Sequence, residues 1–438
     1  MKQTAQHIFR ETLAAIDIPA SIERKLARSG SRIRAGNASI DLRDFKSIVA
    51  IAFGKAAFAM AQGLARVLGA EFAPEGILVV PMPGPAELPG WRTFVGGHPV
   101  PNEGSFAAGR AILDRLAACD ERTLIFFLIS GGGSSLVEQP LDPGMTLADF
   151  VQLHSALITC GAPISEINAV RKHLSATKGG RLAAAAPFSM KLTLAISDVP
   201  QGEESALASG PTLPDPTTIR DAEHIAREYK LIEKLPPAIR SAFDSHSLRE
   251  TPKTRDAAFV RSHFVLLLGP HELLHAAHHA CEAAGHLCVC DNATDNWPVE
   301  KAVDYLLALL AAHANANPNR RVAVLCDGEL SSPVTGDGIG GRNSAFVLAC
   351  VAKIAGKKIT VLSAGTDGID GNSSAAGAVA DGESLGRARD AGLDPGDFLR
   401  RSDSATFFAR LGDAIVTGPT GNNLRDLRIL LAEPDARA

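Results

Sequence analysis

The 438-residue chain lacks several features that would assign it to a class at once. No apolar stretch reaches the ~18 residues that a membrane-spanning helix needs. No long run of charges of one sign occurs, and 44 basic residues against 48 acidic ones leave a formal net charge of -4. These absences argue against a membrane-spanning protein and against a partner that is a nucleic acid or an anionic membrane.

Paired cysteines are missing as well. The seven cysteines are scattered, odd in number and mostly set in apolar runs, and no CxxC pair occurs. We therefore expect buried thiols in a reducing compartment. Residues 1–18 mix charged and apolar side chains in the pattern of an amphipathic helix, which differs from a signal peptide. The expectation is a soluble, cytoplasmic protein, long enough for two or three domains.

What the chain does contain is an unbroken apolar run, residues 124–129, that stops in Ser130-Gly131-Gly132-Gly133-Ser134-Ser135. Apolar residues without alternation are typical of a strand covered on both faces, as in a parallel sheet. The loop after such a strand is where open α/β sheets bind ligands. Glycines let backbone N–H groups approach an anion, and the hydroxyls add donors. The loop predicts a phosphate or carboxylate site, although a tight turn without a ligand has the same composition.

Two basic segments point to the same chemistry. Lys55 follows the strand-like run 47–53 and precedes an Ala-rich helix over 56–68, so it is expected near a helix N-terminus that already favours anions. The segment is not a Walker A loop, because Val49 and Ala56 replace residues that this motif requires. A solvated surface lysine is the alternative. The second segment predicts an anion-facing corner, against a solvated helix face, and contains Arg171, Lys172, His173, Lys178 and Arg181.

Acidic residues and an arginine follow further strand-like runs. Asp198 ends the run 191–197, where it could hold a metal or accept a proton. Asp367 and Asp370 lie in a Gly-rich loop after 358–364 and could hold Mg²⁺ or orient a hydroxyl, with a plain Asx turn as the alternative. After the run 321–326, a flexible loop leads to Arg342 and Asn343 at the start of a helix over 343–355. A guanidinium there suits bidentate contact with phosphate.

Two familiar motifs match only by their letters. His271-Glu272-Leu-Leu-His275 fits the zinc-protease pattern, but the apolar spacing already predicts a crossover helix between strands 264–268 and 286–290. We expect no catalytic zinc there. Gly336, Gly338 and Gly341 fit the dinucleotide pattern GxGxxG, yet about ten residues separate them from the preceding strand, which disfavours a nicotinamide site. The chain is expected to close with a helix from Leu424.

Taken together, these segments resemble the class of glycerate 2-kinases whose C-terminal domain carries the MOFRL motif. The resemblance covers nearly the whole chain. The chain departs mildly from the family pattern at Asn422, where Thr is usual, and at 327–329, where Asp-Gly-Glu replaces Gly-Gly-Glu. The segments that carry the resemblance are, in order, 53–57, 97–99, 130–135, 168–182, 197–200, 209–212, 340–343, 363–371 and 418–428.

The resemblance implies an α/β protein with a Rossmann-like, doubly wound N-terminal domain and a smaller α/β C-terminal domain, with the active site in the cleft between them. We expect the domains at 1–250 and 251–411, with 412–438 packing back onto the first. The implied reaction is phosphorylation of the 2-hydroxyl of D-glycerate to 2-phosphoglycerate, with ATP and Mg²⁺. The chain would bind these small molecules and no nucleic acid or membrane, and it could form a homodimer.

Phosphoryl transfer needs cations on the moving group, a metal held by carboxylates and an acid that positions the hydroxyl. Lys55 and Arg342 would supply the cations, and Asp198 and Asp367 the metal-binding or base functions, without an assignment between the two. The remaining contacts to substrate or phosphate would come from Ser130, Gly131, Gly132, Gly133, Ser134, Ser135, Lys178 and Asn343. The alternatives are an NAD(P)H-dependent hydroxypyruvate reductase and a non-enzymatic sugar-acid-binding protein.

Overall fold

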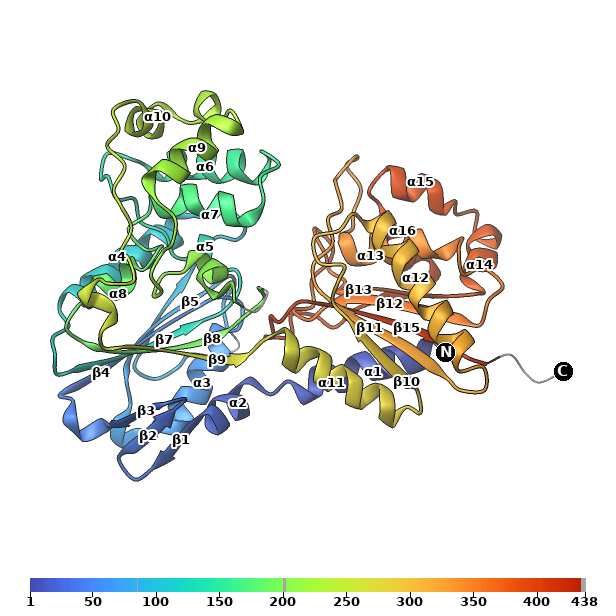
Figure 1. The fold of residues 1–438 in the computed structure, drawn as a ribbon, viewed down its shortest axis with the longest axis horizontal. Helices are drawn as coiled ribbons and strands as arrows, with labels where there is room; N and C mark the ends of the chain where they lie inside the picture. Colours follow the sequence, from blue (N-terminus) through green and yellow to red (C-terminus); the bar gives the residue numbers. More distant parts are fainter. Residues whose placement is uncertain (85, 200–201, 435–438) are drawn as a thin grey trace. The chain divides into compact units, whose positions relative to one another are not determined.

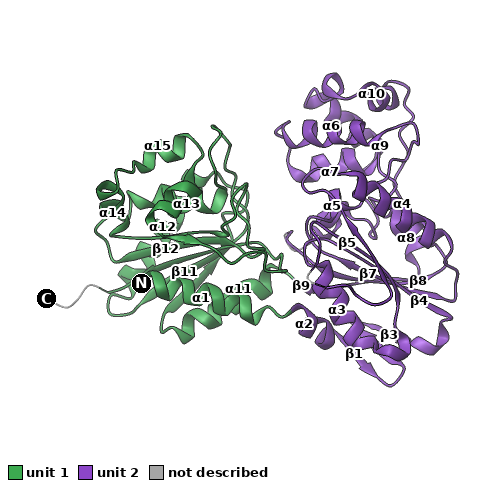
Figure 2. Cartoon of the chain, turned by 180° about the vertical axis from the view of Figure 1, so that it is seen from behind, with its two compact units in different colours: residues 1–17, 269–438 green, residues 18–268 purple. Residues whose placement is uncertain are grey.

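The computed structural model describes residues 1–84, 86–199 and 202–434. The chain divides into two compact units, shown in different colours in Figure 2: unit 1 comprises residues 1–17 and 269–438, and unit 2 comprises residues 18–268. The predicted boundary at residue 250 therefore lies too early in the chain. Residues 1–17, predicted for the N-terminal domain, belong to the unit formed by the C-terminal half.

Unit 2 is built on a parallel six-stranded sheet with the strand order β6-β5-β4-β7-β8-β9. Numbered along the chain, this is the order 3-2-1-4-5-6 of the Rossmann fold, so the predicted doubly wound α/β class is confirmed. The strands are β4 (Ser47–Phe53), β5 (Glu75–Val80), β6 (Trp91–Val95), β7 (Thr123–Ile129), β8 (Met190–Ile196) and β9 (Ser262–Leu268).

The uniformly apolar sequence of β7 has a direct structural reason. All seven of its residues are buried, because helices cover both faces of the sheet. The helix α4 (Glu103–Ala117) packs with Ile125 and Phe127 in one core cluster, and α3 (Ala57–Leu68) lies against the opposite face (Figure 1). Successive side chains of a strand alternate between the two faces, so no position of β7 meets water.

Two smaller structures extend unit 2. An antiparallel sheet contains β1 (Leu26–Ser29), β2 (Arg32–Ala35) and β3 (Ala38–Asp41). A helical group with its own apolar core lies beyond the carboxyl edge of the parallel sheet (Figure 1). Its helices are α6 (Leu147–Ile158), α7 (Ile164–Lys172), α9 (Ile219–Glu228) and α10 (Pro237–Asp244), and the unit also contains α2 (Ile18–Lys25), α5 (Gly133–Leu136) and α8 (Arg181–Ala184).

Unit 1 contains a mixed six-stranded sheet in the order β10-β11-β15-β12-β13-β14. The parallel pair β10 and β11 is followed by β15, which runs antiparallel to both β11 and β12. The strands are β10 (Leu287–Asp291), β11 (Val322–Asp327), β12 (Ile359–Gly365), β13 (Gly377–Asp381), β14 (Ala414–Ile415) and β15 (Asp426–Ala432).

The strand β15 corrects two predictions about the C-terminus. The expected helix from Leu424 is a strand, and the segment 412–434 does not return to the N-terminal domain, because β15 lies inside the sheet of unit 1. Leucine, arginine and alanine are good helix formers, but intrinsic propensity is a weak preference that tertiary pairing overrides. Here β15 forms ladders with strands on both sides, and all seven of its residues are buried.

Helices cover both faces of this second sheet. The helices α1 (Lys2–Ala15) and α11 (Pro270–Ala283) pack together against one face. The other face carries α12 (Val299–Ala316), α13 (Arg342–Val351), α14 (Ser384–Asp390), α15 (Pro395–Arg400) and α16 (Ser404–Leu411) (Figure 1). The sequence predicted that α11 connects two strands of one sheet. This prediction is wrong, because β9 belongs to unit 2 and β10 to unit 1.

None of the described helices combines the length and the apolar character that a membrane span requires.

Candidate active site

The carboxyl ends of β4 and β7 mark the point where the strand order of unit 2 reverses. From β4 the chain continues to β5 and β6 on one side, and β7 is followed by β8 and β9 on the other. Ligands of open α/β sheets bind at such a point. Phe53 pairs with Ile129 at the last position of both strands. The Gly54-Lys55 turn and the 130–135 loop therefore leave the sheet side by side.

Hydrogen bonds tie these two segments together. The Lys55 N–H donates to the carbonyl of Gly131 at 3.0 Å, and the Ala56 N–H donates to the hydroxyl of Ser130 at 3.0 Å. Gly54 has φ +124°, and a Cβ at this position would lie 2.2 Å from Ser130 Oγ, so only glycine fits. Ser130 is buried and its hydroxyl fixes the turn. We therefore assign Ser130 to the structure of the loop.

The middle of the loop faces two side chains with titratable groups. A Cβ at Gly132, which has φ +82°, would lie 3.3 Å from Lys55 Cγ and 3.6 Å from His98 Nδ1. His98 Nδ1 also shares a hydrogen bond of 3.1 Å with Ser135 Oγ. Lys55 and His98 thus lie over the glycine loop. His98 is absent from the predicted site residues, although the Gly97-His98-Pro99 sequence ahead of a helix was a signal for it.

The far end of the loop is held by side chains from later in the chain. Ser134 Oγ and Ser209 Oγ share a hydrogen bond of 2.8 Å, and the Ser209 hydroxyl donates to Asn168 Oδ1 at 2.8 Å. Asp198 follows β8, the next strand after β7 in the sheet, and is partly exposed. Lys55, the 130–135 loop and Asp198 therefore share one edge of the sheet.

Lys178 was predicted to contact substrate or phosphate beside this loop, but its ammonium points into the protein. Its ammonium donates to Glu138 Oε2 at 2.7 Å and to the carbonyl of Val137 at 3.2 Å, and both charged side chains are only 1% exposed. Burial by itself would raise the pKa of Glu138, but Lys178 and His154 together outweigh it and hold the pKa at about 2. Since its charge is used inside the protein, we drop Lys178 from the proposed phosphate contacts.

The basic segment that contains Arg171 and Lys172 is also largely buried, and an internal acid pairs with one of its cations. The Lys172 ammonium donates to Asp215 Oδ1 at 3.0 Å, and both side chains are buried. Arg171 is also buried, and burial lowers its pKa to about 10. Most side chains of the anion-facing corner predicted from the sequence are therefore buried, and Lys172 and Lys178 are paired with acids.

In unit 1, the carboxyl ends of β11 and β12 and the amino end of β15 meet at one edge of the sheet. Gly365 pairs with Asp426 in the β12–β15 register, and α13 begins nearby with Arg342. The Arg342 Nε donates to the Asp426 carboxylate, and its Nη2 lies 2.8 Å from Glu329 Oε1. Burial would lower the pKa of Arg342, but the two carboxylates outweigh it and raise the pKa. Arg342 stays charged at every working pH.

The sequence predicted that the N-terminus of α13 favours a bound anion. Asp370 already caps this N-terminus, so its N–H groups are occupied. The N–H groups of Asn343 and Ser344 donate to the two oxygens of the Asp370 carboxylate, each at 2.9 Å. Asn343 is 2% exposed, and its side-chain oxygen accepts a hydrogen bond from the Ser363 hydroxyl at 2.5 Å. The predicted contact of Asn343 with substrate is therefore not supported, and Arg342 can act only through its guanidinium.

Asp367 forms the Asx turn that was the alternative at the sequence level. Its Oδ1 accepts a hydrogen bond from the Ile369 N–H at 3.0 Å, and the side chain is partly exposed. Beside it lies a group that the sequence did not reveal: Arg425 pairs with Asp295 and, at 3.3 Å, with Asp327. Among the described residues, no group of three or more His, Cys, Asp or Glu side chains is arranged to hold a metal ion.

The three glycines of the GxGxxG match have a packing role. A Cβ at Gly336 would lie 2.5 Å from the carbonyl oxygen of Arg401, and a Cβ at Gly338 would lie 2.5 Å from Asp403 Cβ. β11 ends at Asp327, well before the first of these glycines. Gly336 and Gly338 therefore allow one loop to pack closely on another, and Gly341 packs against Asp370 at the start of α13.

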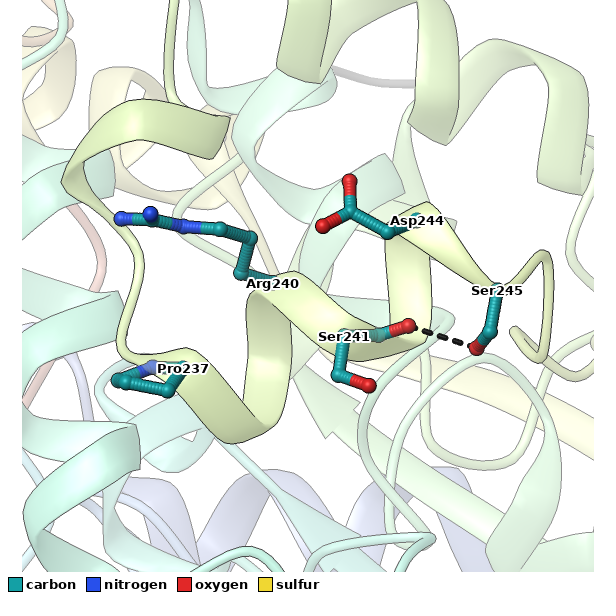
Figure 3. Close-up of a pocket in the computed structure, with 5 residues that line it drawn as sticks. All are labelled: Pro237, Arg240, Ser241, Asp244 and Ser245. Atoms are coloured by element: carbon teal, nitrogen blue, oxygen red, sulfur yellow. Dashed lines mark hydrogen bonds between the residues drawn. The ribbon is translucent and has the colours of Figure 1, made fainter.

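Two surface hollows lie away from Lys55 and the 130–135 loop of unit 2 and from Arg342 and Asp367 of unit 1. One lies on α10, as Figure 3 shows, and the other lies between β5, β6 and α4. Neither is lined by a residue of the predicted site, so we assign no function to them. The lining residues of the first are Pro237, Arg240, Ser241, Asp244 and Ser245.

A Rossmann-order parallel sheet with a glycine loop and a lysine at its switch point, together with a second unit on a mixed sheet, defines a class of two-unit α/β proteins. Residues 4–244 match a domain of unknown function, DUF4147, and residues 322–426 match the MOFRL family. The chain belongs to the family that combines these two domains, which includes glycerate 2-kinases.

Several proteins of this family align over most of the chain. A relative from Agrobacterium vitis with the provisional name hydroxypyruvate reductase is 38% identical, over 87% of this chain and 98% of its own length. The D-glycerate 2-kinase of Thermotoga maritima is 32% identical, over 90% of this chain and 93% of its own length. A crystal structure of glycerate kinase from T. maritima superposes with a TM-score of 0.81 at 29% identity and covers 99% of both chains.

Proposed function

We propose that this protein transfers the terminal phosphoryl group of ATP to the 2-hydroxyl of D-glycerate and so forms 2-phosphoglycerate. The observation that carries the proposal is the position of Lys55 over the 130–135 glycine loop, at the switch point of a parallel sheet. That arrangement suits an anionic group, and relatives that align with nearly the whole chain are named glycerate kinases.

The chain's own groups match the needs of the reaction. The first N–H groups of a helical turn lack partners within the turn, so the start of α5 at Gly133 can donate to an oxyanion. Lys55 would add a positive charge beside those donors. Asp198, on the same sheet edge, is suited to accept the proton of the attacking hydroxyl or to bind the metal. ATP, when bound, supplies the phosphoryl group that moves.

We propose that Mg²⁺ arrives with the nucleotide. Magnesium in kinases usually takes only one or two protein carboxylates and completes its shell with phosphate oxygens and water. Asp198 and Asp367 are the partly exposed acids that follow strands β8 and β12, and each offers a carboxylate of the required kind. Arg342 and Asp367 of unit 1 remain part of the proposal, and substitution of each is the test of its role.

A hydroxypyruvate reductase is the second candidate, because one of the most similar relatives carries that provisional name. A Rossmann reductase binds its dinucleotide at a GxGxxG turn directly after the first strand of the sheet. In this chain the residues after that first strand, β4, are Gly54, Lys55 and Ala56, and the GxGxxG match lies in the packed loop of unit 1. The absence of a GxGxxG turn after β4 favours the kinase over the reductase.

One assay separates the two activities. Purified protein is supplied with D-glycerate, ATP and MgCl₂, and the product is identified as 2- or 3-phosphoglycerate. We expect 2-phosphoglycerate, and loss of turnover when a chelator removes Mg²⁺. In parallel, the oxidation of NADH and NADPH is followed with hydroxypyruvate as substrate. Reduction of hydroxypyruvate faster than phosphorylation of glycerate would overturn the proposal.

A further inference from the structure

Arg342 has two carboxylate partners that are held in different ways. Its Nε donates to Asp426, whose side chain is 5% exposed, and its Nη2 lies 2.8 Å from Glu329, whose side chain is 43% exposed. Arg342 itself is 35% exposed. The Arg342–Glu329 pair is therefore partly accessible to solvent, whereas Asp426 is not.

Asp426 is fixed in place. It is the first residue of β15, its backbone pairs with Gly365, and its buried carboxylate also takes a hydrogen bond from the Asn343 side chain. Glu329, in contrast, lies in the loop that follows β11, where its backbone N–H donates to Asp295 Oδ1 at 2.8 Å. The backbone of Glu329 is thus anchored, and its side chain is the part that reaches toward Arg342 from the surface.

The charges around the guanidinium explain why one carboxylate has to move. Asp426, Glu329 and the nearby Asp370 place three acids around one arginine, and all three act on its pKa. A further anion would meet a site that is already negative. Asp426 and Asp370 are buried and hydrogen-bonded, so withdrawing either would leave unpaired groups in the core. Glu329 is 43% exposed, so water can solvate its carboxylate when an anion takes its place on Arg342.

We infer that Glu329 is a resident counter-anion of Arg342, which the oxyanion of a substrate displaces. The inference rests on the proposed function, in which Arg342 binds an anionic group of the nucleotide or of glycerate. A glutamate carboxylate, a glycerate carboxylate and a phosphoryl group all present a pair of oxygens to a guanidinium, so one can replace another. Glu329 competes with the substrate and keeps Arg342 oriented when the substrate is absent.

Substitution of Glu329 by Gln tests this role, because it keeps the size of the side chain and removes the competing charge. The dissociation constants of inorganic phosphate and of D-glycerate are measured by calorimetry on the full-length protein. We expect Glu329→Gln to bind one of the two anions about two- to fivefold more tightly than the natural protein, the range of an exposed ion pair. The anion that gains affinity identifies which group Arg342 binds.

The matched control is Glu433→Gln. Glu433 also pairs with an arginine in unit 1, at 3.7 Å from Arg321, but Arg321 precedes β11 whereas Glu329 follows it. The control should leave both dissociation constants unchanged. Unchanged or weaker binding by Glu329→Gln, for both anions, would overturn the inference. The kinase assay on the natural protein decides the proposed function separately, since it does not depend on how Glu329→Gln behaves.

Discussion

Lys55 and Arg342 differ from the other cations of the predicted site in that part of each side chain stays accessible. Lys55 lies over Gly132 and is partly exposed, and Arg342 is 35% exposed. Lys178, by comparison, is 1% exposed and paired with Glu138. A cation can stabilise a transferred phosphoryl group only if that group can reach it, so Lys55 and Arg342 are the residues to test.

We predict that Lys55→Met and Arg342→Met each lower kcat by about 10²–10³, with little effect on the KM for glycerate. Donors aimed at developing charge are typically worth roughly 3–4 kcal/mol in the transition state. Steady-state kinetics with glycerate and ATP measure the effect. Methionine keeps much of the length of the side chain and removes the charge, so the loss reports on the charge.

Lys46→Met is the matched control for Lys55, because Lys46 is an exposed lysine just before β4 and Lys55 follows the same strand. It should leave kcat unchanged. A different result for Arg342→Met, an unchanged kcat with a raised KM for glycerate alone, would make Arg342 a clamp for the substrate carboxylate. Its assignment to the phosphoryl group would then be withdrawn.

At the scale of elements, the buried pair of Glu138 and Lys178 joins the end of the glycine loop to the segment after α7. The Ser175 hydroxyl also donates to Glu138, and the Thr177 hydroxyl donates to the Val137 carbonyl at 3.2 Å. We predict that Lys178→Met lowers the free energy of unfolding by about 3–5 kcal/mol, because the buried Glu138 carboxylate loses the cation that balances its charge. Urea unfolding measures the loss. The double variant Glu138→Gln/Lys178→Met should lose less, and an equal loss would contradict this account.

The same pair predicts how stability depends on acid. The pKa of Glu138 falls from its ordinary 4.5 to about 2 in the folded protein, so the unfolded chain binds this proton more readily. The stability that results is fully present above the ordinary pKa and is lost as the pH falls toward the folded value. Unfolding measured between about pH 5 and about pH 3 should show this loss, and it should be smaller in Lys178→Met, where the group that lowers the pKa most is absent.

At the scale of the whole molecule, the first helix of the chain belongs to the unit formed by its last 170 residues. Phe9 is 1% exposed, and α1 packs against α11 and the sheet of unit 1. We predict that Phe9→Ala destabilises unit 1 by about 3–5 kcal/mol and leaves unit 2 unaffected. Hydrogen exchange should show faster exchange in β12 and β15 and unchanged protection in β4 and β7.

Arg10→Ala serves as the control for this substitution, since Arg10 is the exposed neighbour of Phe9 on the same helix. It should leave exchange in both units unchanged. Faster exchange in β4 and β7 of the Phe9→Ala variant would show that the two units unfold together, which would contradict the division of the chain at residues 17 and 268.

The sequence by itself determined the strands that are buried on both faces and the loops at their ends. The runs that became β4 and β7 are almost wholly apolar without alternation, so their pattern alone predicts strands of a parallel sheet, and the positions of Lys55 and the 130–135 loop follow from it. The run that became β8 alternates in its first half, and Asp198 follows its apolar end. The start of α13 at Arg342 was also predicted within one residue.

Only the tertiary structure decided which charges are available and which segments pair across the chain. The run that became β15 is as compatible with a helix as with a strand, and the two ladders with β11 and β12 settle it. Likewise, Lys178 and Lys55 are both lysines beside glycines in the sequence. In the structure Lys178 is buried and paired with Glu138, whereas Lys55 is partly exposed over Gly132. The physical reason is that burial and strand pairing depend on residues distant along the chain, which local patterns do not record.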